Sequence, residues 1–285
     1  MQALAEYIMR RRFNAVAVAF VCALLPLLEW LGAAAVALVT LRKGWQEGVF
    51  VLTWACISGG LRWAVGDVLI LPTLVLVFCG AAVLRQSVSL LYAIITTTAL
   101  SALVMVLFQK VMPIGLERLV TKTGDMFAEL QLLEKLAVTN PEQWIVELAL
   151  TGFGLSVAVM ALAGLLIGRW WQAKLYYPGG FQDEFHQLRL SPLMLATLAA
   201  VAVVAVGLVP QLRLIGALIS LPVFLVGLSL VHSVAKILGF GLQVLVLFYV
   251  LLILFSGYVY LLLLLLVIAD SFINIRQRLA HTNDQ

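Results

Sequence analysis

Long apolar runs recur along almost the whole chain, and they limit the possible folds more than any other feature. A transmembrane helix needs about 20 predominantly apolar residues to cross roughly 30 Å of hydrocarbon. The clear candidates are Val49–Val65, Val68–Leu84, Leu90–Met112, Trp144–Gly168, Leu193–Val209, Leu214–Lys236 and Leu242–Ala269. We therefore expect an all-α fold, a polytopic transmembrane helical bundle. It forms a single integral membrane domain over residues 1–285, with the lipid bilayer as its solvent.

The N-terminal run Phe13–Leu41 is harder to interpret. As one helix of about 29 residues it would reach about 43 Å, which is long for one span. Pro26, Glu29 and Gly32 near its centre favour a break. The chain then has eight spans, or nine if this run is split. Composition supports this class, because 64% of the residues are hydrophobic and 11% are charged, against about 45–50% and about 25% in soluble domains.

Lysine and arginine in short loops set the orientation of membrane helices. If Phe13–Leu41 is a kinked hairpin, most basic residues collect on the cytoplasmic side and the acid-rich segment 114–143 lies opposite. The basic residues are Arg10, Arg11, Arg12, Arg42, Lys43, Arg85, Arg169, Lys174, Arg189 and Lys236. Arg276 and Arg278 then fall on the wrong side, unless the last run turns back at Ser256-Gly257. A single helix over Phe13–Leu41 would place both termini inside; we favour the hairpin.

Two connections between the apolar runs carry patterns of their own. Segment 114–143 has apolar residues at helical spacing, which predicts an amphipathic helix on the membrane surface. A gating or partner-binding role is the alternative for it. The second connection is an aromatic-rich interfacial loop, 169–192, in which Pro178-Gly179-Gly180 forms a turn before a short amphipathic helix.

The aromatic residues of loop 169–192 have two interpretations. Tryptophan and tyrosine are enriched at membrane interfaces, so the loop would be an elbow that anchors two spans. Alternatively, its 169–190 part docks a cytoplasmic or membrane protein partner. The docking candidates are Trp170, Trp171, Tyr177, Phe181 and Phe185.

Several classes of chemistry lack their sequence signals. The chain has neither a phosphate-binding loop of the G-x-x-x-x-G-K-[ST] type nor a G-x-S-x-G nucleophile turn. Its three histidines, His186, His232 and His281, are far apart. The net charge of +4 is spread over the ends of the runs, which argues against nucleic acid as a partner. We therefore expect no enzyme, no cofactor and no metal site.

Ionisable residues at the edges of the runs are the best candidates for a ligand-binding site. Charged groups are costly near hydrocarbon, and they often face a cavity or a partner charge. Arg62 and Asp67 flank the turn between two runs, and Glu29 lies beside Pro26 at a break. The simpler alternatives are that Arg62 reaches the interface, Asp67 caps a helix and Glu29 marks the membrane boundary. The G-x-x-x-G pattern Gly164–Gly168 predicts close helix packing.

Three stretches carry a family resemblance. WWQAKLYYPGGFQDEFHQLRLSP, ALVTLRKG (Ala37–Gly44) and LLLVIADSFINIRQR (Leu264–Arg278) resemble the YybS-like family of uncharacterised bacterial membrane proteins. That family is distantly similar to the substrate-capture subunits of energy-coupling-factor transporters, which rely on partner proteins for ATP hydrolysis. The chain departs from those subunits in having more than six expected spans, and it shows no vitamin-site signature.

The resemblance implies a multi-pass protein of the bacterial inner membrane with transporter-like architecture. No binding residue is carried over from that family; the ionisable residues Glu29, Arg62 and Asp67 supply the candidate site at which the chain would bind or move a small or lipidic solute, with a partner supplying any energy. The alternative is a non-transporting membrane scaffold or assembly factor that recruits a partner through the 169–190 loop.

Overall fold

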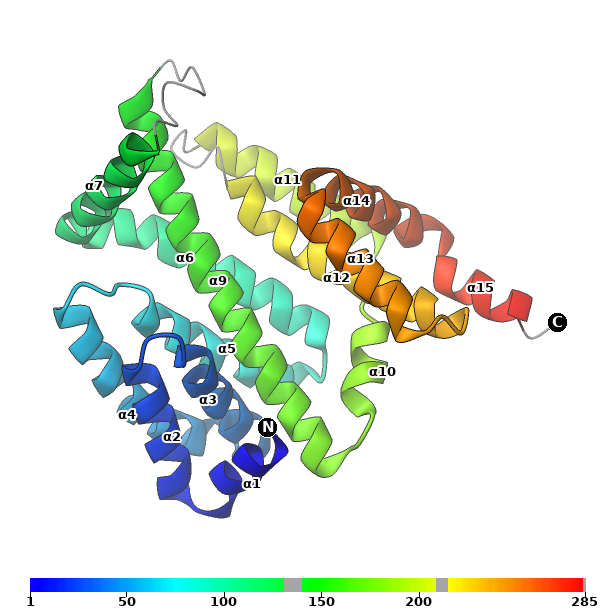
Figure 1. Ribbon diagram of the computed structural model, residues 1–285, viewed down its shortest axis with the longest axis horizontal. Coiled ribbons are helices and arrows are strands. Elements are labelled where there is room, and N and C mark those ends of the chain that lie inside the picture. The colour runs from blue at the N-terminus through cyan, green and yellow to red at the C-terminus, as the bar shows by residue number, and fades with distance from the viewer. Residues whose placement is uncertain (131–139, 209–214, 284–285) are drawn as a thin grey trace. The chain divides into compact units, whose positions relative to one another are not determined.

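The computed structural model describes residues 1–130, 140–208 and 215–283, and every regular element in these ranges is a helix (Figure 1). The expected all-α class is confirmed. Within these ranges, five helices are long and apolar enough to cross a membrane: α5 (Ile70–Ser87), α6 (Leu90–Val111), α9 (Pro141–Tyr176), α12 (Gly216–Ile237) and α14 (Ser256–Ile273). Shorter apolar helices are α2 (Arg12–Leu24), α11 (Pro192–Leu208) and α13 (Leu242–Leu254). The count of eight or nine spans stays a prediction, and the expected span ends at Val209 and Leu214 lie outside the described residues.

The contacts within the chain divide it into two compact units. Unit 1 comprises Met1–Phe181 and Ala205–Leu218, and unit 2 comprises Gln182–Val204 and Ile219–Gln285. The sequence predicts a single membrane domain over residues 1–285 and does not predict this division into two units.

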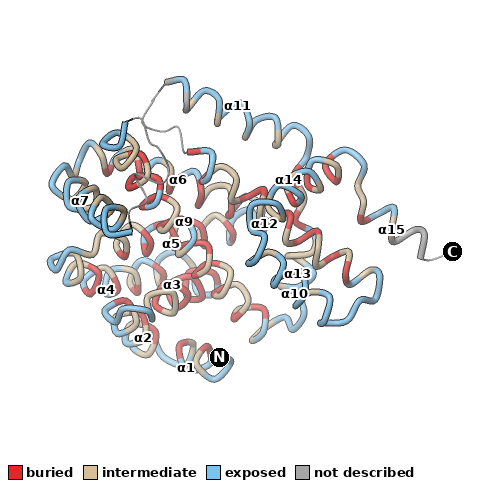
Figure 2. Tube along the Cα trace, turned by 45° about the horizontal axis from the view of Figure 1, so that its top comes forward, coloured by how far each residue is buried: buried red, intermediate tan, exposed pale blue. Residues whose placement is uncertain are grey.

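Unit 1 is built around α3 (Glu29–Lys43), whose residues 32–41 are all buried (Figure 2). A helix that is apolar on every side belongs in an interior. α3 packs against α2, α4 (Trp45–Ala64), α5 and α9. The contact with α9 is very close, since a Cβ atom on Gly164 would lie 2.7 Å from Cβ of Ala33. The prediction of close helix packing at Gly164–Gly168 is confirmed.

The run Phe13–Leu41 folds as two helices, α2 and α3, that pack against each other. The break spans residues 25–28, where Leu27 has a φ of 70°. A Cβ atom on Gly32 would lie 3.0 Å from the carbonyl oxygen of Ala19 in α2, so the two helices approach closely. The one-helix alternative is wrong, and the helical pair agrees with the favoured arrangement.

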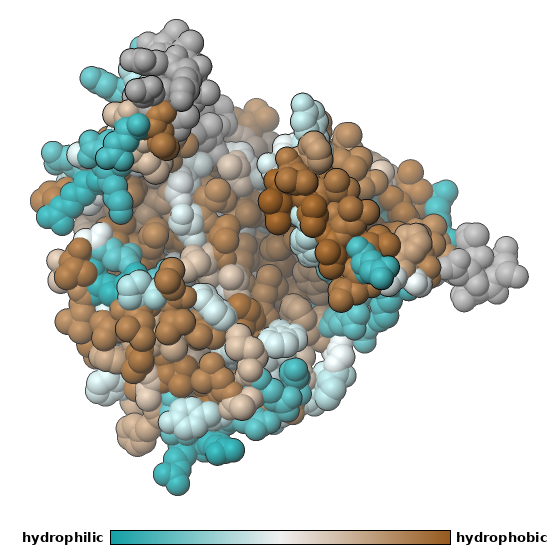
Figure 3. All heavy atoms as spheres, viewed as in Figure 1, coloured by the Kyte–Doolittle hydropathy of each residue, from teal (hydrophilic) through white to brown (hydrophobic). Residues whose placement is uncertain are grey.

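Basic residues gather at one end of unit 1. Arg12 pairs with Glu47 at 3.2 Å, Arg85 donates to the carbonyl oxygen of Leu41, and Arg42 lies 4.0 Å from the ring centroid of Tyr176. These contacts bring the basic ends of α2, α3, α5 and α9 together. α1 (Gln2–Arg10) packs on α2, α3 and α9. In Figure 3 hydrophilic side chains gather over α1 and over α7 (Pro113–Glu129), and hydrophobic surface covers the helices between them.

In unit 2 the expected span Leu242–Ala269 is wrong as a single helix. Phe255, with φ −122° and ψ 38°, separates α13 from α14. The ring of His232 in α12 contacts Tyr249 of α13, whereas Phe224 of α12 stacks on Tyr260 of α14. α13 therefore runs antiparallel to α12, and α14 turns back alongside it. This reversal places Arg276 and Arg278 at the same end of unit 2 as Arg189 and Lys236.

The aromatic-rich segment is helical in its first part. α9 continues to Tyr176, so the expected helix end at Gly168 and the expected loop over 169–176 are wrong. Proline and glycine end the helix only at Pro178-Gly179-Gly180, where Gly179 has a φ of 90°. The short helix α10 (Gly180–His186) follows, as predicted.

Segment 114–143 is helical over α7, which has no buried residue. The apolar stripe and polar face expected for this segment fall on this helix. The rest of the predicted amphipathic segment includes residues 131–139, which lie outside the described part of the chain.

Candidate functional site

The structure brings the three predicted ligand-binding residues together. The guanidinium of Arg62, on the last turn of α4, donates to Oε2 of Glu29 and to Oδ2 of Asp67. It also donates to the carbonyl oxygen of Ala23 at 3.3 Å. The side chains of Arg62, Glu29 and Asp67 are 14%, 17% and 22% exposed. We call these three residues the Arg62 cluster.

Local sequence explains how each member is placed. Glu29 is the first residue of α3, where the positive end of the helix dipole favours a carboxylate. Oδ1 of Asp67 accepts a hydrogen bond from the backbone N–H of Leu69 at 3.0 Å, just before α5. Gly66, with a φ of 98°, makes the turn that returns Asp67 toward Arg62. Asp67 therefore orders the turn before α5 and pairs with Arg62, and the simpler alternative of a helix cap is wrong, because α5 has no side-chain cap hydrogen bond.

The Arg62 cluster lines a cavity of about 1020 Å³. The upper range for small-molecule sites is about 1,000 Å³. Three other parts of unit 1 complete its wall: the turn after α4, the end of α6 with α7, and the first half of α9. Apolar lining residues include Val65, Leu69, Met112, Leu119, Met126, Phe127, Leu148 and Phe153. The cavity thus combines an apolar wall with a few charged groups.

Helix α7 supplies the basic side of this cavity. Arg118 and Lys122 lie one turn apart on α7, and both are exposed and line the cavity. α7 packs against α6 and α9, and the ring of Phe127 meets Trp144 edge-on at 5.2 Å. The sequence predicts a surface helix here and does not predict that the helix forms a cavity wall. The sequence feature that could have indicated it is the basic pair Arg118 and Lys122, four residues apart, beside an apolar stripe.

The five docking candidates do not share one exposed surface. Trp171 is fully buried, so it does not contribute to an exposed docking surface in this structure. Trp170 holds Lys174 over its ring at 5.2 Å, and Tyr177 is 67% exposed. Phe181 ends the first stretch of unit 1. Phe185 lies in unit 2, where its ring meets His232 edge-on at 5.9 Å.

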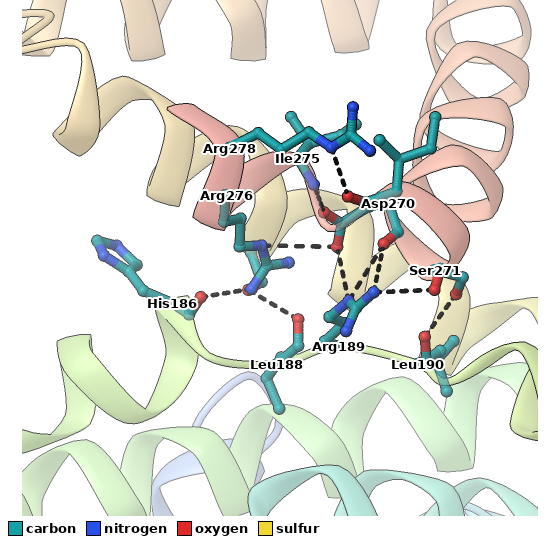
Figure 4. A network of polar contacts seen from close by, with 11 residues as sticks. His186, Leu188, Arg189, Leu190, Asp270, Ser271, Ile275, Arg276 and Arg278 are labelled. Carbon is teal, nitrogen blue, oxygen red and sulfur yellow. Dashed lines mark hydrogen bonds and ion pairs between the residues drawn. The ribbon is translucent and has the colours of Figure 1, made fainter. Parts of the chain in front are cut away.

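Unit 2 holds a second charged cluster at the end of α14, which the sequence did not single out as a site (Figure 4). Asp270 is 1% exposed. Its Oδ2 atom lies 3.7 Å from Nε of Arg189 and 3.7 Å from Nε of Arg276. Its Oδ1 atom accepts from the backbone N–H of Ile275 at 2.9 Å. We call Asp270, Arg189 and Arg276 the Asp270 cluster.

Arg189 is engaged with backbone, whereas Arg276 uses only Nη1, and its buried Nε and Nη2 atoms have no hydrogen-bond partner among the described residues. Arg189 donates to the carbonyl oxygens of Asp270, at 2.9 Å from Nη2, and of Ser271, at 2.8 Å. These carbonyls belong to the last turn of α14, and that of Asp270 also accepts from the backbone N–H of Asn274 at 3.0 Å. Arg276 donates to the carbonyl oxygen of His186. The cluster therefore ties the segment before α11 to the corner between α14 and α15 (Ile275–Asn283).

Among the described residues, no group of three or more histidine, cysteine, aspartate or glutamate side chains could hold a metal ion. No family model, curated protein or solved structure matches this chain. The resemblance to the YybS-like family therefore stays a prediction. What stands is that the chain is an all-helical protein with several helices that suit a membrane and with a polar cluster lining a cavity in unit 1.

Proposed function

We propose that this chain is an integral membrane protein of transporter-like architecture that binds a small or lipidic solute in the unit 1 cavity. The observation that carries this proposal is the convergence of Glu29, Arg62 and Asp67 on the wall of one cavity. Three charged groups near hydrocarbon are costly, and such groups in membrane proteins mark substrate pathways and binding sites.

The backbone around the cluster supports the same function. The α2–α3 pair breaks at residues 25–28, beside Glu29. Irregular backbone at membrane depth is tolerated where it is buried in protein or lines a cavity, and interrupted helices often carry transporter sites. Basic residues gather at the opposite end of unit 1, so by the positive-inside rule we propose that the cavity lies near the outer face. We propose the bacterial inner membrane as its location.

A glycine in the cavity wall allows a direct test. A Cβ atom on Gly152, which lines the cavity, meets nothing within 4 Å. Gly152→Leu should therefore place its side chain in the cavity from a Cβ position that meets no other atom. Gly60→Leu is the matched control, because Gly60 also has open space but does not line the cavity.

The measurement is native mass spectrometry of the purified protein in detergent. We expect a small molecule or lipid bound to the unchanged protein and to Gly60→Leu, and at least a tenfold loss in Gly152→Leu. Equal occupancy in all three proteins would show that the cavity is not the binding site. The scaffold alternative gains no support here, since Trp171, one of its five candidate residues, is fully buried.

A further inference from the structure

We propose that the solute is a zwitterionic amphiphile whose amine contacts Glu29 and whose anionic group contacts Arg118 and Lys122. This inference rests on the proposed function, and it names the chemical class that the same cavity selects. Its source is either an amine-bearing phospholipid of the bilayer or a free zwitterion of similar chemistry.

The Arg62 cluster provides a site for a cation. Two carboxylates share one guanidinium, so the cluster carries a net charge of −1 (2 negative, 1 positive). Both oxygens of Asp67 are engaged, with Arg62 and with the N–H of Leu69. Glu29 uses only Oε2, and among the described residues its Oε1 has no hydrogen-bond partner. That oxygen, in a largely buried carboxylate on the cavity wall, is placed to accept an N–H from an ammonium group.

Helix α7 provides a site for an anion. Arg118 and Lys122 both line the cavity, and neither forms an ion pair with another described residue. Their spacing of four residues puts both on one face of α7. A guanidinium and an ammonium side by side suit a phosphate or a carboxylate.

The apolar wall accounts for the rest of the ligand. Leu119, Met126 and Phe127 share α7 with the two basic residues, and Leu148 and Phe153 line the cavity from α9. A purely anionic or purely cationic solute would use only one of the two charged walls. A zwitterion with an apolar body complements all three surfaces.

The test measures the thermal midpoint of the purified protein during titration with defined probes. The probes are short-chain phosphatidylethanolamine, short-chain phosphatidylglycerol and free phosphoethanolamine. We expect saturable stabilisation by phosphatidylethanolamine at concentrations at least tenfold lower than by phosphatidylglycerol, which lacks the amine. Stabilisation by phosphoethanolamine at equally low concentration would identify a free zwitterion as the source, and its failure to match the lipid would identify the bilayer.

Variants separate the two charged walls. Glu29→Gln should remove the preference for the amine, so that phosphatidylethanolamine and phosphatidylglycerol stabilise the variant at similar concentrations. Lys122→Gln should weaken both lipids about tenfold, and because Lys122 is exposed the fold should not depend on it. Asp125→Asn on α7 and Lys110→Gln at the end of α6 are controls, since neither residue lines this cavity. Both should bind as the unchanged protein does.

The failure of this inference differs from the failure of the proposed function. Equal stabilisation by both lipids, with no effect of Glu29→Gln, would overturn the zwitterion while the cavity remained a binding site. If no probe gave saturable stabilisation but Gly152→Leu still lost its solute, the zwitterion would also be overturned while the cavity remained a binding site. If Gly152→Leu kept its solute, both proposals would fall together.

Discussion

The Arg62 cluster of unit 1 and the Asp270 cluster of unit 2 are built from the same residue types but serve different purposes. In the Arg62 cluster carboxylates are in excess, and one carboxylate oxygen remains open on a cavity wall. In the Asp270 cluster guanidinium groups are in excess, and they bind carbonyl oxygens at helix ends. The Asp270 cluster also has unused atoms, Oδ2 of Asp270 and Nε and Nη2 of Arg276, but these are buried and its carbonyl contacts hold helices in place. A charged cluster that faces a cavity with unused atoms is a candidate binding site.

The largest expected effect lies in unit 2. Asp270→Asn removes the one negative charge between Arg189 and Arg276 and leaves a buried guanidinium uncompensated. We expect the free energy of unfolding to fall by roughly 3–5 kcal/mol, with no change in the solute bound by unit 1. Denaturant titration in detergent measures the free energy of unfolding, and native mass spectrometry measures the bound solute. Asp183→Asn is the control, because its ion pair with Lys236 joins side chains that are 64% and 55% exposed. If both variants lost the same stability, the Asp270 cluster would not be the clamp described here.

Arg62→Gln tests the other side of the comparison. It leaves Glu29 and Asp67 without their shared donor, so we expect a smaller loss of roughly 1.5–3 kcal/mol together with at least a tenfold loss of bound solute. Arg85→Gln is the matched control, since Arg85 also donates to a backbone carbonyl but at the basic end of unit 1. If Arg62→Gln lost stability but kept its solute, the Arg62 cluster would have only a structural role, like the Asp270 cluster.

Gly164→Val tests the packing that holds α3 in the centre of unit 1. The added side chain would press on Ala33 from a Cβ position only 2.7 Å away. Overpacking of this kind costs about 1–3 kcal/mol, and thermal unfolding in detergent measures it. Gly152→Ala, on the same helix but with open space, should leave the midpoint unchanged or raise it slightly. A neutral Gly164→Val would mean that α3 and α9 can separate without cost.

The smallest expected effect is a pH dependence of unit 2. Burial, together with the nearby charges of Lys236, His232 and Arg276, lowers the pKa of His186, and Asp183 opposes this. The unfolded chain therefore binds a proton more readily than the folded one does. The free energy of unfolding should be highest above about pH 6.5, the pKa of an unperturbed histidine. It should decrease as the pH falls below that value and level off below the pKa of His186 in the folded protein. Thermal midpoints between pH 8 and pH 5 measure this, and His186→Gln should flatten the profile. An unchanged profile in that variant would assign the dependence to another group.

The class of the fold and the members of the Arg62 cluster could be predicted from the sequence. Apolar runs of membrane length are a direct signal, and charged residues beside Pro26 and the turn at Gly66 are few enough to single out. The close packing at Gly164 and Gly168 was also readable, because small residues at that spacing have few other uses in membrane helices.

Other features depend on tertiary contacts that sequence periodicity does not encode. An amphipathic helix such as α7 has the same pattern whether it lies on lipid or covers a cavity. Trp171 suits an interfacial belt by residue type, and only the continuation of α9 to Tyr176 places it in an interior. Ser256-Gly257 only weakly indicates that the chain reverses at Phe255. The direction of α13 and α14 follows from their contacts with α12, which the local sequence does not show.

The short helices α2 and α3 have a consequence for how the protein enters the membrane. They contain 13 and 15 residues, about 20 Å and 23 Å of helix, which is less than the hydrocarbon thickness of roughly 30 Å. We therefore expect neither helix to enter the membrane as an independent span. The pair should enter as one hairpin, with Glu29 near its tip. It would reach its buried position only when Arg62, made later in the chain, arrives to neutralise that carboxylate.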